Sequence, residues 1–351
     1  MGDGSADLPR GPEGGQVRRR DPHQERQARP RWPESRHYAA LDLGTNNCRL
    51  LIARPQGSGF AVVDAFSRIV RLGEGLAATG RISDAAIERT LAALRVCADK
   101  LKRRNVTLAR SVATEACRQA SNGAEFIERV YHETGIALDV ITAEEEARLA
   151  VLGCHALLEP GEGPAIVFDI GGGSTELVLV DSRVPVPAIL DWHSAPWGVV
   201  SLTEAAGQPA PGPEGLALLY ADMRARVKAS FAPFADRLAK PSGAPRLLGT
   251  SGTVTTLASV HLGLVAYDRS VIDGLIVPTD SMREVSARLA GMTLAERGQV
   301  PCIGTERADL VVAGCAILET ILDLWPAERL GIADRGIREG ILRRLINGHM
   351  L

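Results

Sequence analysis

Ile166-Val-Phe-Asp169-Ile-Gly171-Gly172-Gly173-Ser174-Thr175-Glu176-Leu-Val-Leu-Val180 is the stretch that decides the fold. Apolar residues on both sides of a glycine-rich turn predict a β-hairpin whose arms are largely buried. The glycines let backbone N–H groups approach a ligand, and Asp169 and Glu176 bracket the turn. Carboxylates repel a bare phosphate. A divalent cation bound by both the carboxylates and the phosphate would remove this repulsion. The alternative is an ordinary glycine-rich hairpin turn.

A second copy of the pattern stands near the start of the chain, as Ala39-Ala-Leu-Asp42-Leu-Gly44-Thr45-Asn46-Asn47-Cys-Arg49-Leu-Leu-Ile-Ala53. Aligned with the first, Asp42 matches Asp169 and Gly44 matches Gly171. An internal repeat of this kind predicts two similar domains that face each other across a cleft. Arg49 stands where the other copy has Glu176. One half-site therefore offers a guanidinium for phosphate, and the other a carboxylate for metal or water.

Bulk composition is that of an ordinary globular protein. The 351 residues are enough for two domains, with 45% hydrophobic and 23% charged side chains. A net charge of −2 gives no general case for nucleic-acid or membrane binding. No apolar run approaches the roughly 20 residues needed to cross a bilayer. The six cysteines include no CxxC pair, which indicates reduced thiols of a cytoplasmic protein.

Residues 1–37 have the composition of a disordered tail, with Arg18-Arg19-Arg20 and almost no aliphatic side chains. The basic run could bind an anionic partner, although a solvated tail or a misassigned start fits the composition better. Folded structure is expected from about Tyr38. Towards the other end, the pattern predicts helices over 280–291 and 307–324 and a single strand, Arg329–Ala333.

Three further places carry candidate ligand contacts. Arg118 lies in a short polar helix after a strand, where α/β proteins often bind ligands, and the alternative is a solvated surface arginine. Residues 142–149 open a helix with three glutamates, 144–146, which commonly serve the helix dipole. One of them near the cleft could accept a proton from water, but spacing does not choose among them. Residues 247–258 run from a strand through a Gly/Thr/Ser turn into a helix, a geometry that binds anions.

Six motifs in this order resemble the exopolyphosphatase/guanosine pentaphosphate phosphatase (Ppx/GppA) family: DLGTNNCRL, ATEACRQASN, EEEARL, DIGGGSTELV, GTSGTVTTLA and ADRGIREGIL. The resemblance covers about residues 38–347 and suggests the short form, without extra C-terminal helical domains. It implies the α/β actin-like ATPase fold, with two RNase-H-like domains around a central cleft. We expect domain I to span 38–149 and domain II 150–335, with the last helix, 336–351, rejoining domain I.

The resemblance also implies roles for residues of these motifs. Glu146 matches the catalytic glutamate that activates water, a choice that spacing alone does not make. Asp169 matches the aspartate linked to Mg²⁺, and Glu176 matches the second carboxylate near the cation and the water. The expected phosphate-binding residues are Gly44, Thr45, Asn46, Asn47, Arg49, Arg118, Gly171, Gly172, Gly173, Ser174, Thr175, Gly249, Thr250, Ser251, Gly252 and Thr253.

Two motifs depart from the pattern of the family. The first turn reads Thr45-Asn46-Asn47 where a serine-containing loop is usual, so an amide replaces a hydroxyl. The segment TEACRQ stands where T-S-A-x-R-D is more common, which places Glu115 at a serine position. Neither change removes a catalytic group, and both could tune the choice of substrate.

The sequence therefore predicts an exopolyphosphatase that releases terminal phosphate by Mg²⁺-assisted attack of water. The first alternative is a guanosine pentaphosphate 5′-phosphohydrolase, and the second a nucleotide-binding regulatory protein or kinase of the same fold. We expect a cytoplasmic protein without a membrane or specific nucleic-acid partner. A homodimer is compatible with the apolar helices, which could equally be core. Chain-length preference, the physiological metal and the oligomeric state do not follow from the sequence.

Overall fold

The computed structural model describes residues 1–2, 36–57, 59–162, 164–183, 187–238 and 245–348. The predicted disordered tail, residues 1–37, lies outside the described residues except at its two ends. Glu34–Leu351 form one compact unit, which holds all the elements below. No helix within the described ranges is long and apolar enough to cross a membrane.

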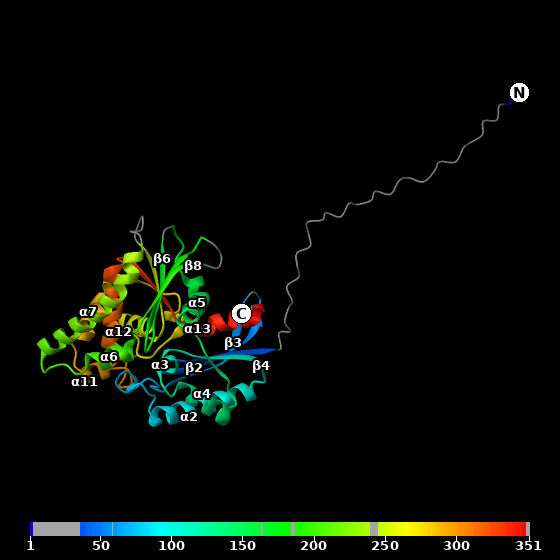
Figure 1. Cartoon of the computed structure of the whole chain (residues 1–351). Coiled ribbons are helices and arrows are strands. Elements are labelled where there is room, and N and C mark those ends of the chain that lie inside the picture. The colour runs from blue at the N-terminus through cyan, green and yellow to red at the C-terminus, as the bar shows by residue number, and fades with distance from the viewer. Residues whose placement is uncertain (3–35, 58, 163, 184–186, 239–244, 349–351) are drawn as a thin grey trace. The chain divides into compact units, whose positions relative to one another are not determined.

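The first sheet contains the N-terminal copy of the repeat (Figure 1). Its strands are β1 (His37–Leu43), β2 (Asn47–Gln56), β3 (Gly59–Ile69), β4 (Val106–Ala113) and β5 (Leu138–Val140). They lie in the order β3-β2-β1-β4-β5. β1, β2 and β3 pair antiparallel, whereas β4 and β5 run parallel to β1.

The second sheet repeats this topology. Its strands are β6 (Ala165–Ile170), β7 (Thr175–Asp181), β8 (Ala188–Ala195), β9 (Arg246–Thr250), β10 (Ile276–Pro278) and β11 (Arg329–Ala333). The order β8-β7-β6-β9-β11 matches that of the first sheet, and β10 adds one antiparallel edge strand. The predicted α/β fold with two related halves is confirmed. The prediction of one C-terminal strand is wrong, because β10 is three residues long and ends in proline, too short for an alternating pattern.

Helices connect and cover the sheets. They are α1 (Leu76–Thr79), α2 (Asp84–Arg103), α3 (Glu115–Gln119), α4 (Gly123–Thr134), α5 (Ala143–Cys154), α6 (Val199–Ala206), α7 (Pro213–Arg237), α8 (Gly252–His261), α9 (Arg269–Ile272), α10 (Thr279–Ala290), α11 (Leu294–Gly298), α12 (Val311–Leu324) and α13 (Ile337–Asn347). Side chains cap several N-termini, as where the Thr142 hydroxyl accepts a hydrogen bond at the start of α5. α12 begins later than predicted, because residues 305–310 form turns, in which the N–H of Leu310 donates to the carbonyl of Arg307.

α5 packs against both sheets. Its Leu149 belongs to the apolar cluster on the first sheet, together with Ala40 of β1 and Ile341 of α13. Its Val151 belongs instead to a cluster with Val167 of the second sheet. α2 and α4 cover the other face of the first sheet, and α7, α8, α10 and α12 cover the other face of the second (Figure 1). This packing fixes the N-terminus of α5 between the two repeats. The predicted domain boundaries stay a prediction.

Candidate active site

The turns of the two hairpins touch each other. A Cβ atom built on Gly172 would lie 3.0 Å from the backbone nitrogen of Asn46, and one on Gly173 would lie 2.7 Å from Oγ1 of Thr45. Real Cβ atoms essentially never come within 3.0 Å of another heavy atom, so a side chain at Gly173 would force Thr45 or the turn that carries it to shift. The glycine run therefore allows close contact between the halves, in addition to any contact with a ligand.

The third turn is tied to the second hairpin through Ser251. Its hydroxyl donates to the carbonyl of Ile170 (2.7 Å) and accepts the N–H of Thr253 (3.4 Å), which caps α8. Ser251 holds this position at φ 97°, a conformation that only glycine adopts easily. The next residue, Gly252, faces the first half, because a Cβ on it would lie 3.1 Å from the guanidinium of Arg49.

A cleft of about 140 Å³ lies where the three turns meet. The predicted site residues that line it are Gly44, Thr45, Asn46, Asn47, Arg49, Glu146, Asp169, Gly171, Gly172, Gly173, Ser174, Thr250, Ser251, Gly252 and Thr253. Residues without a predicted role also line it, among them Asp42, Thr114, Glu115, Val199, Thr256, Arg307, Leu310, Val311, Asp334, Arg335 and Arg338. The structure therefore brings together residues from motifs scattered over the whole folded chain.

Three of the predicted residues lie behind the lining of the cleft. The hydroxyl of Thr175 donates to the carbonyl of Trp197 (2.6 Å). Gly249 faces the ring of Phe168, which would lie 2.7 Å from a Cβ atom there. Glu176 is only 2% exposed, and its Oε1 accepts the hydroxyl of Ser194 (2.9 Å). These positions support the cleft from behind, and the predicted roles of these residues stay predictions.

Arg118 also lies outside the lining, with its guanidinium on the carboxylates of two glutamates. Nη1 of Arg118 donates to Glu146 Oε2 (2.8 Å) and to the carbonyl of Ile141 (2.8 Å). Its Nε (2.9 Å) and Nη2 (2.6 Å) both donate to Glu115 Oε2. Arg118 therefore contacts the predicted base, and its predicted contact with phosphate remains untested.

The three glutamates at the start of α5 have different surroundings. Glu144 pairs with Arg148 (2.7 Å), and Glu145 pairs with Arg110 (2.7 Å), both away from the cleft. Glu146 is 7% exposed and lines the cleft. Only the third glutamate is therefore placed to meet a substrate, which is the distinction that spacing could not make.

Buried carboxylates gather around the cleft, and burial and their neighbours raise their pKa values. Burial, followed by the negative charge of Asp42, raises the pKa of Asp169 to about 6. Burial and Asp169 raise the pKa of Glu176 to about 7. Burial and the neighbouring Glu176 raise the pKa of Glu146 well above its usual range. Desolvated carboxylates that repel one another favour a bound proton or cation.

The positive charge of the cleft comes from arginines. Three of these arginines, Arg49, Arg307 and Arg338, form no ion pair within the part of the chain that the structure describes. In the same part of the chain, their side chains make one hydrogen bond, which Arg307 donates to Thr256 Oγ1 (3.2 Å). The motif ADRGIREGIL contains Arg338, so its place in the resemblance could have pointed to this residue. Arg307 carries no motif signal, and sequence reasoning missed it.

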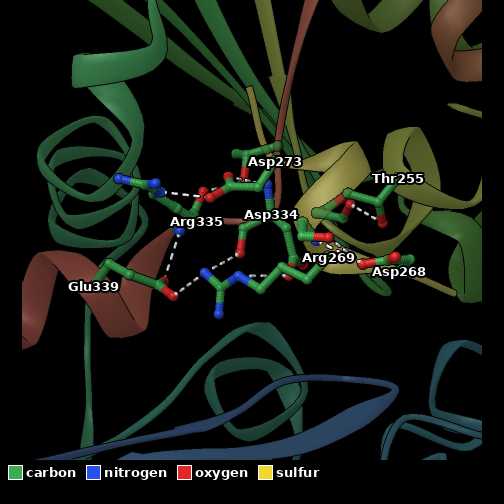
Figure 2. Close-up of polar contacts among 11 residues, drawn as sticks. Thr255, Asp268, Arg269, Asp273, Asp334, Arg335 and Glu339 are labelled. Atoms are coloured by element: carbon green, nitrogen blue, oxygen red, sulfur yellow. Dashed lines mark hydrogen bonds and ion pairs between the residues drawn. The ribbon is translucent and has the colours of Figure 1, made fainter. Parts of the chain in front are cut away.

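A polar network holds the connection that carries Arg338 (Figure 2). Arg269 donates to Glu339 Oε1 (3.0 Å), whose Oε2 accepts the N–H of Gly336 (2.9 Å) at the start of α13. Arg335 donates from Nε to Asp273 Oδ2 (2.6 Å). These bonds fix the turn between β11 and α13, and so place Arg338 in the cleft.

A second set of contacts joins the two halves beside the cleft. Arg71, in the loop after β3, donates to both oxygens of Asp309 (2.7 and 3.1 Å) and to the carbonyl of Glu306 (3.0 Å). The N–H of Gly75 in the same loop donates to Glu204 of α6 (2.8 Å). Because Glu306 and Asp309 flank Arg307, these contacts also position that arginine.

The donor atoms of the cleft fit a hard divalent cation that shares its ligands with phosphate. Across the described ranges, no three His, Cys, Asp or Glu side chains are grouped closely enough to hold an ion alone. Mg²⁺ commonly needs only one or two carboxylates, with water and phosphate oxygens as its other ligands. Asp169 supplies such a carboxylate, and the buried Oδ1 of Asn46 is an acceptor with no partner among the described residues.

Comparison with known proteins gives one consistent result. The Ppx/GppA phosphatase family model matches residues 51–349. "Exopolyphosphatase 2" of Mycobacterium tuberculosis is 34% identical over 318 residues, which cover 86% of this chain and 96% of that protein. "Guanosine-5'-triphosphate,3'-diphosphate pyrophosphatase" of Aeromonas salmonicida is 28% identical, and the match covers 89% of this chain but 60% of that protein.

Solved structures agree. The crystal structure of an "exopolyphosphatase-like protein" has a TM-score of 0.77 at 30% identity, covering 89% of this chain and 98% of that one. A family member from Aquifex aeolicus has a TM-score of 0.71 at 28% identity, covering 90% of this chain and 99% of that one. The likeness therefore extends over both halves and the cleft between them.

Proposed function

This chain belongs to the Ppx/GppA phosphatase family of phosphoanhydride hydrolases, and on that premise we propose that it releases terminal phosphate from inorganic polyphosphate. The observation that supports this substrate is the lining of one cleft by Glu146, Asp169 and three arginines that form no ion pair with any described residue. Guanidinium groups suit phosphate oxygens, because their planar forks donate two hydrogen bonds at once. A chain of phosphates would present such oxygens to several arginines in turn.

Asp169 and Glu176 would hold the cation, here taken as Mg²⁺, with substrate oxygens and water as its other ligands. When bound, the cation would offset negative charge on the phosphate oxygens. Asp169 reaches the cleft itself, whereas Glu176 lies directly opposite it in the β6–β7 pairing. Burial raises both pKa values, with a further rise from Asp42 at Asp169 and from Asp169 at Glu176, and this supports a bound cation at this place.

Glu146 would act as general base. An oxygen–phosphorus bond forms between water and the terminal phosphate, and the bridging P–O bond breaks. The proton of the water goes to Glu146, and the electron pair of the broken bond leaves with the shortened chain. Burial that raises the pKa of Glu146 makes it a stronger base, and the N–H of Arg118 fixes the orientation of its Oε2.

Phosphate release from long-chain polyphosphate, with Glu146→Gln as the variant, tests this proposal. Removing a general base typically costs about 10²–10⁴-fold in rate, so we expect turnover to fall at least 10²-fold while the thermal midpoint stays near that of the wild type. Glu144→Gln is the matched control, because Glu144 pairs with Arg148 outside the cleft. Near wild-type turnover of folded Glu146→Gln would show that the assigned base is wrong.

Guanosine pentaphosphate is the second candidate substrate. It is favoured by the apolar side chains of Val199, Leu310 and Val311, which line the cleft together with Arg307 and offer a surface for a nucleobase. Assaying both substrates in parallel separates the candidates. Release from the nucleotide alone would overturn the polyphosphate proposal, and release from neither would favour a binding role.

A further inference from the structure

We propose that Glu115 is a positioning residue that orients Glu146 through Arg118, and that it does so at the expense of substrate affinity. The inference rests on the proposed function, in which Glu146 is the base. Glu115 is the first residue of α3, and its side chain is 16% exposed and lines the cleft. Only Thr114 separates Glu115 from the end of β4, so the residue lies at the edge of the first sheet.

The carboxylate of Glu115 is held at both oxygens. Oε2 accepts two hydrogen bonds from Arg118, at 2.9 Å from Nε and 2.6 Å from Nη2. Oε1 accepts from the side-chain amide of Gln119, one turn later on α3. A carboxylate bonded on both sides is a rigid acceptor, and it determines which way the guanidinium of Arg118 faces.

The opposite edge of Arg118 faces Glu146. Nη1 of Arg118 donates to Glu146 Oε2 and to the carbonyl of Ile141, both at 2.8 Å. An arginine has five N–H donors, and the four bonds to Glu115, Glu146 and Ile141 use all of them except one on Nη2. Arg118 cannot turn towards a phosphate in the cleft without giving up a bond to Glu115 or Glu146. Glu115 therefore keeps Arg118 on the base and away from the substrate.

The same carboxylate works against the binding of an anion. Glu115, Arg118 and Glu146 together carry one net negative charge when ionised, at the wall of a cleft that must accept phosphate. Replacing Glu115 by an uncharged residue removes this repulsion and frees the edge of Arg118 for a phosphate oxygen. Binding should tighten, while the donor that orients Glu146 loses its fixed position. A residue that only fills space would not change affinity and rate in opposite directions.

Glutamine is the informative replacement, because Glu115 also packs across the cleft. Its Cγ would lie 3.0 Å from a Cβ atom on Gly173 of the other half. Glu115→Gln keeps the volume and shape of the side chain and removes its charge. Changes in this variant therefore report on the bond to Arg118 and not on the contact between the halves.

The experiment compares wild type, Glu115→Gln, Arg118→Ala and the double variant. Affinity is measured by calorimetry with a methylene-bridged triphosphate analogue, which does not turn over, and kcat is measured on polyphosphate. We expect Glu115→Gln to bind the analogue about fivefold more tightly and to turn over about tenfold more slowly. In the Arg118→Ala background, Glu115→Gln should not slow turnover further. Glu144→Gln is the charge-matched control and should change neither quantity by more than twofold.

The inference is overturned if Glu115→Gln binds and turns over within twofold of wild type. It is also overturned if Glu115→Gln slows turnover just as much without Arg118, because Glu115 would then act directly. Wild-type turnover alone tests the proposed function, so the two can fail separately. If the wild type hydrolyses neither candidate substrate, the affinity for the triphosphate analogue tests the inference. Tighter binding by Glu115→Gln that disappears in the Arg118→Ala background would show that Glu115 controls Arg118. Unchanged binding by Glu115→Gln would overturn the inference.

Discussion

The two hairpins have the same backbone pairing but differ in charge. In the first, Asp42 pairs across the strands with Arg49, and in the second, Asp169 pairs with Glu176. The turns close with the same hydrogen bond, from the N–H of the first glycine to the carbonyl three residues on, at 2.9 Å in both. One register position therefore gives a cation in one half and a second anion in the other. A duplicated unit can build a mixed site by changing a single residue.

The difference also appears in the titration of the two aspartates. Burial raises the pKa of Asp42, and the neighbouring guanidinium of Arg49 opposes this rise. Burial and Asp42 raise the pKa of Asp169, and Arg49 opposes this rise too, but the strand partner of Asp169 is Glu176, whose own pKa is raised to about 7. The first hairpin carries its own counter-charge, whereas the second lacks one. The second hairpin is therefore the half that gains most from an external cation.

The largest expected effect follows from Glu176, the residue that makes the hairpins different. If it helps to hold Mg²⁺, Glu176→Gln should lower turnover by about 10²–10³-fold, because the charge on the phosphate is less well balanced. The variant should also lose the rise in thermal midpoint that Mg²⁺ gives the wild type. Phosphate release and thermal unfolding with and without Mg²⁺ check the two parts.

Arg49→Gln is the matching variant in the other hairpin. It should keep the thermal response to Mg²⁺ and raise KM about tenfold, since a charge-assisted hydrogen bond to phosphate is lost. If Arg49→Gln and Glu176→Gln change turnover, KM and the thermal response to Mg²⁺ in the same way, then the first half-site is not specific for phosphate and the second is not specific for the cation.

An intermediate effect should follow from the turn glycines. Alanine at Gly173 would place a methyl group 2.7 Å from Oγ1 of Thr45, whereas at Gly44 the nearest atom, the carbonyl oxygen of Asn47, is 3.7 Å away. Overpacking typically costs about 1–3 kcal/mol, so Gly173→Ala should lower the free energy of unfolding by that amount. Gly44→Ala should lower it by less than about 1 kcal/mol. Denaturant titration measures both, and equal losses would mean that the turns do not press on each other.

The smallest expected effect distinguishes two serines at matching positions. Ser194 lies opposite Glu176 and Ser67 lies opposite Arg49, but only Ser194 is bonded to its partner, at 2.9 Å. Ser194→Ala should reduce turnover about threefold to tenfold, because Glu176 loses the hydroxyl that orients it. Ser67→Ala, on the exposed edge, should leave turnover unchanged. Steady-state kinetics of the two variants decide whether support of Glu176 matters.

Much of the architecture could be predicted from the sequence, because the repeat leaves a local signal twice. Apolar residues on both sides of each turn, together with the turn glycines, predict both hairpins, and the topology confirms two related halves. β10 was missed because three residues ending in Pro278 give no periodic pattern. The late start of α12 was missed because Ala308 and Leu310 continue its helical spacing, whereas residues 305–310 form turns.

The arrangement of the site was less predictable, because it depends on which side chains meet. Composition marks Arg118 as a cation but does not reveal that Glu115 and Glu146 hold it. Nothing local marks Arg307, whose place depends on the loop before α12 and on Arg71. The sequence predicts that Gly172 and Gly173 approach a ligand, and their contact with the other turn exists only after the halves come together.

The contact between the turns has a consequence at the level of codons. Every missense change in a glycine codon adds at least one carbon atom to the side chain. At Gly173 that atom would lie 2.7 Å from Oγ1 of Thr45 in the other turn. No missense change at this codon can preserve the spacing, whatever the chemistry of the new residue. Volume alone therefore opposes missense change at this position, even before any loss of catalysis is counted.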